Sequence, residues 1–88
     1  MTNENLNIHV FTTRFVIKEK SPILKVYHDD DGDWQFIGKE TNLKEEDAMV
    51  VSLGEILNFD PSLKQILSLP MGSNAYRPDQ YSQWIFTE

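Results

Sequence analysis

The residues best suited to chemistry in this sequence are four aspartates that gather around one glycine. They are Asp29, Asp30, Asp31 and Asp33, with Gly32 between the last two. Calcium prefers oxygen ligands, and the calcium loop of an EF-hand is rich in Asp around a required Gly. With Gly32 in the place of that Gly, Tyr27 falls on the first ligand position and Gly38 on the last, and neither has a carboxylate. The cluster is therefore predicted to be a solvated turn, with adventitious cation binding as the alternative.

Other catalytic or metal-binding sets are weaker than the aspartate cluster. His9 and His28 would need a third ligand that the spacing does not provide, so both are expected to make structural hydrogen bonds. No Ser lies in the sharp turn that exposes a hydrolase nucleophile, and no pair of carboxylates falls in a recognisable pocket. The chain has no Cys to act as a nucleophile or ligand. We predict a protein that is not an enzyme and that holds no metal or cofactor.

The aspartates are placed by a predicted β-hairpin. Asp31 and Gly32 suit the two central positions of a type I′ turn, which need positive φ, so strands over 23–29 and 34–38 should pair around them. In that register Asp29 faces Trp34 and Tyr27 faces Phe36, and these four residues share one face. The other face carries Val26, His28, Gln35 and Ile37. Both faces are apolar near the middle, which predicts a central hairpin covered at least partly on both sides.

Further strands are predicted on either side of the hairpin. Residues 8–17 alternate and are rich in β-branched and aromatic types, which indicates one strand that joins the hairpin in an antiparallel meander. The charged segment 39–47 is predicted to be an exposed loop, and the apolar run 48–51 a short buried strand. Residues 74–78 are typical of an irregular loop, and 81–86 of a weak last strand or an extended tail.

Two short helices are predicted between these strands. Ser52 and Glu55 have the spacing of a capping box, and Asp60 followed by Pro61 suits the start of a second helix. Each helix has an apolar stripe with i, i+3, i+4 spacing: Leu53, Ile56 and Leu57 in the first, Leu63, Ile66 and Leu67 in the second. Helices this short need packing partners. A Pro and Gly72 end the second helix, with Gly72 expected at positive φ. The predicted fold class is α+β: an antiparallel sheet of about four to five strands with two short helices packed on it.

The length and charge of the chain limit how many domains it can form and which partners it can bind. Eighty-eight residues predict a single domain over 1–88, with a frayed N-terminus at 1–7 and residues 78–88 as an extended tail if no last strand forms. The polar start and the short apolar runs predict no membrane association and a cytoplasmic location. The net charge of −6 disfavours nucleic acid. Seven of the fourteen acids lie in 29–33 and 45–47, a patch that suits a basic protein partner or serves only to keep the chain soluble.

Four segments in order along the chain resemble a known bacterial family. They are GDWQFIGKE at 32–40, VSLGEI at 51–56, NFDPSL at 58–63 and LPMGSNAYR at 69–77. The match covers roughly residues 24–77, and its most specific parts are the aromatic-Asp-Pro step and the Pro-x-Gly-Ser-x-x-aromatic-Arg segment. The family is a bacterial domain of unknown function, immunity-protein-33-like, which is grouped with the immunity proteins of polymorphic toxin systems. The resemblance implies a protein-binding role.

The residues predicted to bind a partner combine the aspartate cluster with three nearby or family-matching side chains. They are Asp29, Asp30, Asp31, Asp33, Trp34, Tyr76 and Arg77. Two of them have alternatives, because Trp34 could pack in the core and Arg77 could lock its loop through a salt bridge. The predicted function is non-catalytic protein binding, most concretely an immunity protein that neutralises a basic toxin domain. The alternative is a structural or regulatory domain that forms a homo-oligomer through Tyr81, Trp84 and Phe86.

Overall fold

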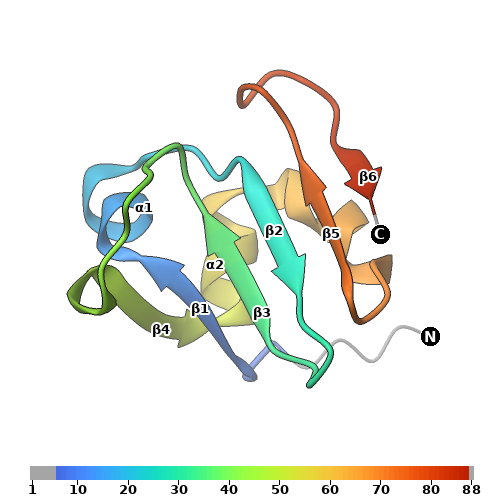
Figure 1. Cartoon of the computed structure of the whole chain (residues 1–88), viewed down its shortest axis with the longest axis horizontal. Coiled ribbons are helices and arrows are strands. Elements are labelled where there is room, and N and C mark those ends of the chain that lie inside the picture. Colours follow the sequence, from blue (N-terminus) through green and yellow to red (C-terminus); the bar gives the residue numbers. More distant parts are fainter. Residues whose placement is uncertain (1–5, 88) are drawn as a thin grey trace.

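A six-stranded sheet with helices on one side forms the structure, a computed structural model that describes residues 6–87 (Figure 1). The strands are β1 (His9–Thr13), β2 (Lys25–His28), β3 (Trp34–Ile37), β4 (Ala48–Ser52), β5 (Ser73–Tyr76) and β6 (Ile85–Thr87). The helices are α1 (Arg14–Glu19), α2 (Leu53–Phe59) and the 3-10 helices η1 (Glu45–Asp47) and η2 (Pro61–Ser68). The spatial order is β4-β1-β3-β2-β5-β6. The predicted α+β class is confirmed.

The sheet is mixed, so the predicted antiparallel meander is wrong. β1 pairs in parallel with β3, while the other neighbouring strands are antiparallel. The predicted strand over 8–17 ends at Thr13, because the Thr13 hydroxyl accepts a hydrogen bond from the Val16 N–H at 3.3 Å and starts α1. The chain leaves the sheet in this helix and returns as β2, which does not lie next to β1. The place between β1 and β2 is taken by β3, which therefore pairs with β1.

The hairpin of β2 and β3 is central, as predicted, but its register differs by one residue. His28 pairs with Trp34 and Val26 with Phe36. The Asp29 N–H donates to the Asp33 carbonyl at 2.8 Å, which leaves three residues in the loop. Of the three loop residues, only Gly32 has positive φ, at 94°, so this longer turn spares Asp31 the left-handed conformation that a type I′ turn demands. The shift by one residue turns Tyr27 away from Phe36.

The core lies between the sheet and the helices. α2 lies behind the sheet in Figure 1, and the buried sheet residues include Val10, Val26 and Phe36. Ser52 caps α2 by accepting from the Glu55 N–H, as predicted, and both predicted apolar stripes face inward. The second helix is correctly placed, but it is a 3-10 helix. Gly72 has φ of 84°, as expected.

Three segment predictions need correction, and one falls mostly outside the described residues. The strand predicted at 48–51 forms, but it lies at the edge of the sheet, where Val50 is 54% exposed. The predicted loop 74–78 is largely strand, because β5 pairs with β2 through residues 73–76. The last strand is shorter than predicted, at Ile85–Thr87. Of the predicted frayed segment 1–7, residues 1–5 are not described, and the Leu6 carbonyl accepts a hydrogen bond from the Gly54 N–H.

Candidate functional site

One face of the sheet carries large apolar side chains that no helix of the described chain covers. α2 and η2 pack on the opposite face, so this face, which we call the open face, is turned toward the viewer in Figure 1. The cross-strand register aligns its side chains: Phe11 faces Val50 and Gln35, Gln35 faces Tyr27, and Lys25 faces Ile37 and Tyr76. Its apolar members are 38% to 54% exposed, with Ile37 more covered: Phe11, Tyr27, Val50, Tyr76, Ile85 and Ile37. The hairpin was predicted to be covered at least partly on both sides, and on this face the cover is only partial: Gln35 and Ile37 are half-buried, while Tyr27 is 38% exposed.

A groove of about 360 Å³ runs over the open face beside β1 and β3. Phe11, Gln35 and Ile37 line it from the sheet, and Leu43 lines it from the loop that precedes β4. We call Asp29, Asp30, Asp31 and Asp33 the acidic tip. Two of these residues, Asp29 and Asp33, also line the groove. An aromatic and aliphatic surface bordered by carboxylates suits the long stem and charged head of a Lys or Arg side chain.

The acidic tip is held by short-range hydrogen bonds. Gln35 Nε2 donates to Asp29 Oδ2 at 2.8 Å, and the Asp33 N–H donates to Asp31 Oδ1 at 3.1 Å. The second bond is an Asx-type contact that stabilises the turn. Within residues 6–87, no group of three or more His, Asp or Glu side chains is arranged to hold a metal ion. The geometry thus presents the tip as a fixed cluster of negative charge.

Asp47 lies at the other end of the groove and is tied to two donors. Arg14 Nε donates to Asp47 Oδ1 at 2.9 Å, and the Lys44 N–H donates to Asp47 Oδ2 at 3.0 Å. The Lys44 N–H, followed by the Arg14 side chain, lowers the pKa of the Asp47 carboxyl below its usual value. The carboxylate therefore anchors the loop before β4 and forms one wall of the groove.

This lowered pKa predicts an acid-sensitive contribution to folding. A carboxyl whose pKa is lower in the folded chain stabilises the fold above its unfolded pKa of about 4, and the contribution disappears as the pH falls through the folded value. Asp47→Asn should therefore unfold more easily than the parent at pH 7, and the difference should shrink in acid. Urea unfolding from pH 7 to pH 2 measures this. A difference between the two chains that stays constant with pH would contradict the assignment.

The structure divides the residues predicted to bind a partner into two groups. The acidic tip is at the surface, and Tyr76 is exposed on the open face. Trp34 lies on the covered face and stacks on His28 with ring centroids 3.8 Å apart. His28 Nδ1 donates to the Leu69 carbonyl at 2.7 Å, which fits the structural role expected for this histidine. Arg77 also points inward, where its side chain is 3% exposed.

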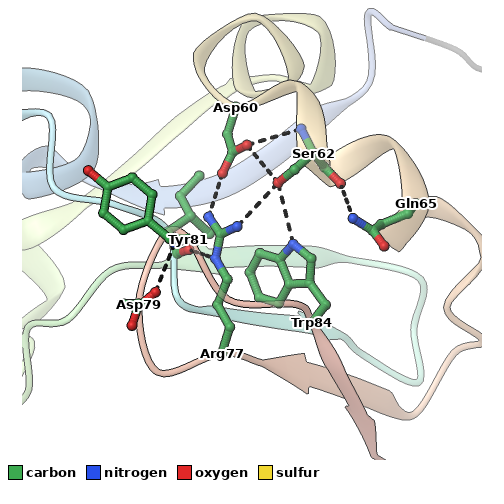
Figure 2. Close-up of polar contacts among 8 residues, drawn as sticks. Asp60, Ser62, Gln65, Arg77, Asp79, Tyr81 and Trp84 are labelled. Atoms are coloured by element: carbon green, nitrogen blue, oxygen red, sulfur yellow. Dashed lines mark hydrogen bonds and ion pairs between the residues drawn. The ribbon is translucent and has the colours of Figure 1, made fainter.

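Arg77 is the centre of a buried polar cluster, as Figure 2 shows. One guanidinium nitrogen lies 2.6 Å from Asp60 Oδ2, and Nε donates to the Ile23 carbonyl at 3.0 Å. Another donates to the Ser62 hydroxyl at 3.3 Å, and the guanidinium carbon lies 4.2 Å from the centre of the Trp84 ring. The cluster joins η2, the segment before β2 and the chain leading to β6. It matches the alternative in which Arg77 locks its loop through a salt bridge.

Most of the residues of the open face could not be found from the sequence alone. Phe11, Val50 and Ile85 come from three distant parts of the chain, and Tyr27 was assigned to the wrong side of β2. A prediction of three loop residues at the tip, in place of two, would have put Tyr27 on the open face. The others are brought together by long-range strand pairing, for which the local pattern carries no signal.

None of the helices in residues 6–87 is long and apolar enough to span a bilayer. Comparisons of the chain with protein-family models, curated proteins and solved structures found no match.

Proposed function

We propose that this chain is a non-catalytic protein-binding domain whose open face and acidic tip bind a basic surface of another protein. The observation that carries the proposal is a group of half-exposed large apolar side chains on a sheet face that no helix of residues 6–87 covers, among them Phe11, Tyr27 and Tyr76. Large exposed apolar side chains gathered on one face of a small domain are typical of an interaction site, and aromatic residues supply much of the affinity in such sites.

Charge supports a basic partner. The chain has a net charge of −6, and Asp29 and Asp33 border the groove that contains Phe11. Complementary charge speeds the encounter of two proteins and rejects acidic competitors, while apolar contacts limit dissociation. Lys and Arg side chains of the partner would lie over Phe11 with their cationic heads at the tip.

The most concrete form of this function is an immunity protein that binds and neutralises a basic toxin domain. The resemblance of residues 24–77 to immunity-type domains supports it, as does the acidic tip. Binding over the basic face of a toxin would block access of its substrate. Tyr76 belongs to the resembling segment and is exposed on the open face, so it joins the proposed contact residues.

The alternative is self-association through the C-terminal segment. Tyr81 is 88% exposed, and Phe86 is exposed on β6. Trp84 is covered by the Arg77 cluster and is less available for such a contact. A homo-oligomer built on this segment would depend on Tyr81 and Phe86 and would leave the acidic tip free.

Matched variants separate the two functions. The immobilised chain is used to capture a partner from lysate of the source cells, and the affinity of the identified partner is then measured. Phe11→Ala with Tyr27→Ala should weaken binding about 30-fold, because two interface aromatics are truncated, and Asp30→Lys with Asp33→Lys should slow association. Tyr81→Ala is the control, with an equally large exposed aromatic away from the open face.

Two outcomes would contradict the proposal. One is a partner that binds the open-face variant as tightly as the parent chain. The other is the absence of any partner together with a mass that rises with concentration and falls back in Tyr81→Ala, which would favour self-association. Loss of binding at high salt with the parent chain would support recognition by charge.

A further inference from the structure

β4 is an outer strand of the sheet and, within residues 6–87, pairs with β1 alone (Figure 1). An outer strand presents unpaired backbone groups to which another extended segment can add. The opposite outer strand, β6, has three residues, whereas β4 has five. β4 also borders the open face, since Val50 lies beside Phe11 in the register. It is therefore the better placed of the two edges to extend the proposed binding surface.

The ladder between β1 and β4 shows which backbone groups point outward. The Leu53 N–H donates to the Ile8 carbonyl at 2.9 Å, which makes His9 and Ser52 a pair without mutual hydrogen bonds. Antiparallel pairs alternate, so Val51 bonds toward β1 and Val50 does not. The N–H and the carbonyl of Val50 thus point away from the sheet.

We propose that this edge binds an extended segment bearing Lys or Arg on the partner, which adds a strand beside β4. The inference rests on the proposed function and names the mode of docking. Main-chain hydrogen bonds to Val50 would hold the segment, and its alternate side chains would continue the open face beyond Phe11. The Val50 side chain, 54% exposed, would pack against them.

The charges at the two ends of β4 select this occupant. Glu45 and Glu46 are exposed just before the strand, and Glu55 is exposed just after it in the first turn of α2. Asp47 is paired with Arg14, and Lys44 is the one cation in residues 44–55. The edge is therefore framed by negative charge, which complements basic residues at both ends of an incoming segment.

The same charges disfavour a second copy of this chain. An antiparallel pair of β4 strands centred on Val50 would bring Glu45 of one copy level with Glu55 of the other. Like charges in such positions are destabilising. The acids thus act against pairing of identical edges and in favour of a basic partner.

The test uses a defined probe and a pair of variants at one residue. The probe is the peptide Lys-Thr-Val-Thr-Val-Thr-Lys with blocked ends, and a second peptide has Glu in place of both Lys. Val50→Pro removes the outward N–H without removing a hydrogen bond to β1, and Val50→Thr keeps that N–H on a side chain of similar size. Binding is followed by NMR shifts of backbone amides, which also show whether each variant is folded.

The Lys peptide should shift the amides of β4 in the parent chain and in Val50→Thr, and bind Val50→Pro at least tenfold more weakly. The Glu peptide should not bind. Glu45 and Glu46 are exposed, so the double variant Glu45→Lys with Glu46→Lys should fold. It should bind the Lys peptide more weakly than the parent chain does and should bind the Glu peptide. This variant keeps the test decisive if Val50→Pro does not fold. The proposal is overturned if the Lys peptide moves no β4 amide at about 1 mM, or if both peptides bind equally.

The experiments distinguish an error in the strand-addition proposal from an error in the proposed function. If the captured partner binds Val50→Pro normally but is lost from Phe11→Ala with Tyr27→Ala, strand addition is wrong and the open face stands. If the partner is lost from Val50→Pro and not from the open-face variant, the edge stands and the open face is wrong. A dimer of the chain that dissociates in Val50→Pro would overturn the choice of a basic partner.

Discussion

Replacement of Arg77 by Ala should lower the free energy of unfolding by about 3–5 kcal/mol, because it breaks a buried ion pair and leaves its partners without a cation. Asp60 and Ser62 would keep acceptors that now face no guanidinium, and the Ile23 carbonyl would lose its Nε donor. Trp84 would lose the cation that lies over its ring. Urea unfolding at pH 7, followed by Trp fluorescence, measures the loss.

Arg14 provides the matched control, since it is the other arginine of the chain. Its side chain is 45% exposed, and Asp47 keeps the Lys44 N–H when Arg14 is removed. Arg14→Ala should therefore cost less than about 1 kcal/mol. Arg77→Lys should fall between the two, because an ammonium keeps the charge but not the planar set of donors. Equal losses for Arg14→Ala and Arg77→Ala would show that the cluster does not hold the C-terminal segment.

Replacement of Phe36 by Ala should cost about 3–5 kcal/mol, the usual range for an aromatic truncated in a core. Phe36 is fully buried in the central strand β3, where it packs toward α2 and η2 and lies 5.9 Å from the Trp34 ring. The truncation leaves a cavity between the sheet and the helices, which hold each other in place. The surrounding chain can therefore collapse little, and little of the lost stability is recovered. Thermal and urea unfolding measure this loss.

Phe11 is the matched control for Phe36, because the same truncation is made on the other face of the sheet. Phe11 is 40% exposed and lies on the open face, so Phe11→Ala should cost less than about 1.5 kcal/mol. Its main effect should be on partner binding. A larger loss of stability for Phe11→Ala than for Phe36→Ala would mean that the assignment of the covered face is wrong, and with it the register of β2 against β3.

The elements that the sequence predicted well are those whose signals are local. The Ser52 cap of α2, the Asp60 cap followed by Pro61, and the positive φ of Gly72 each depend on residues within a few positions. The apolar stripe of each helix is similarly local, and it correctly gave the side that packs. The central hairpin was found from Asp31 and Gly32.

The errors begin where a local pattern admits two structures. Residues 8–17 alternate as a strand would, yet Thr13 caps a helix, and only packing of Val16 in the core decides between them. The tip can form with two or three loop residues, and the difference of one residue moves Tyr27 to the opposite face. Asn74 and Ala75 are poor strand formers, and β5 forms because β2 offers an edge to pair with.

By itself the sequence determined an acidic, cysteine-free α+β domain with two capped helices and a charged hairpin tip, because composition, caps and turns depend on neighbouring residues. Only the tertiary structure decided the parallel pairing of β1 with β3, the burial of Arg77 against Asp60 and the open face around Phe11. Each of these joins residues more than 15 positions apart, and such contacts are chosen by the free energy of the whole packed chain.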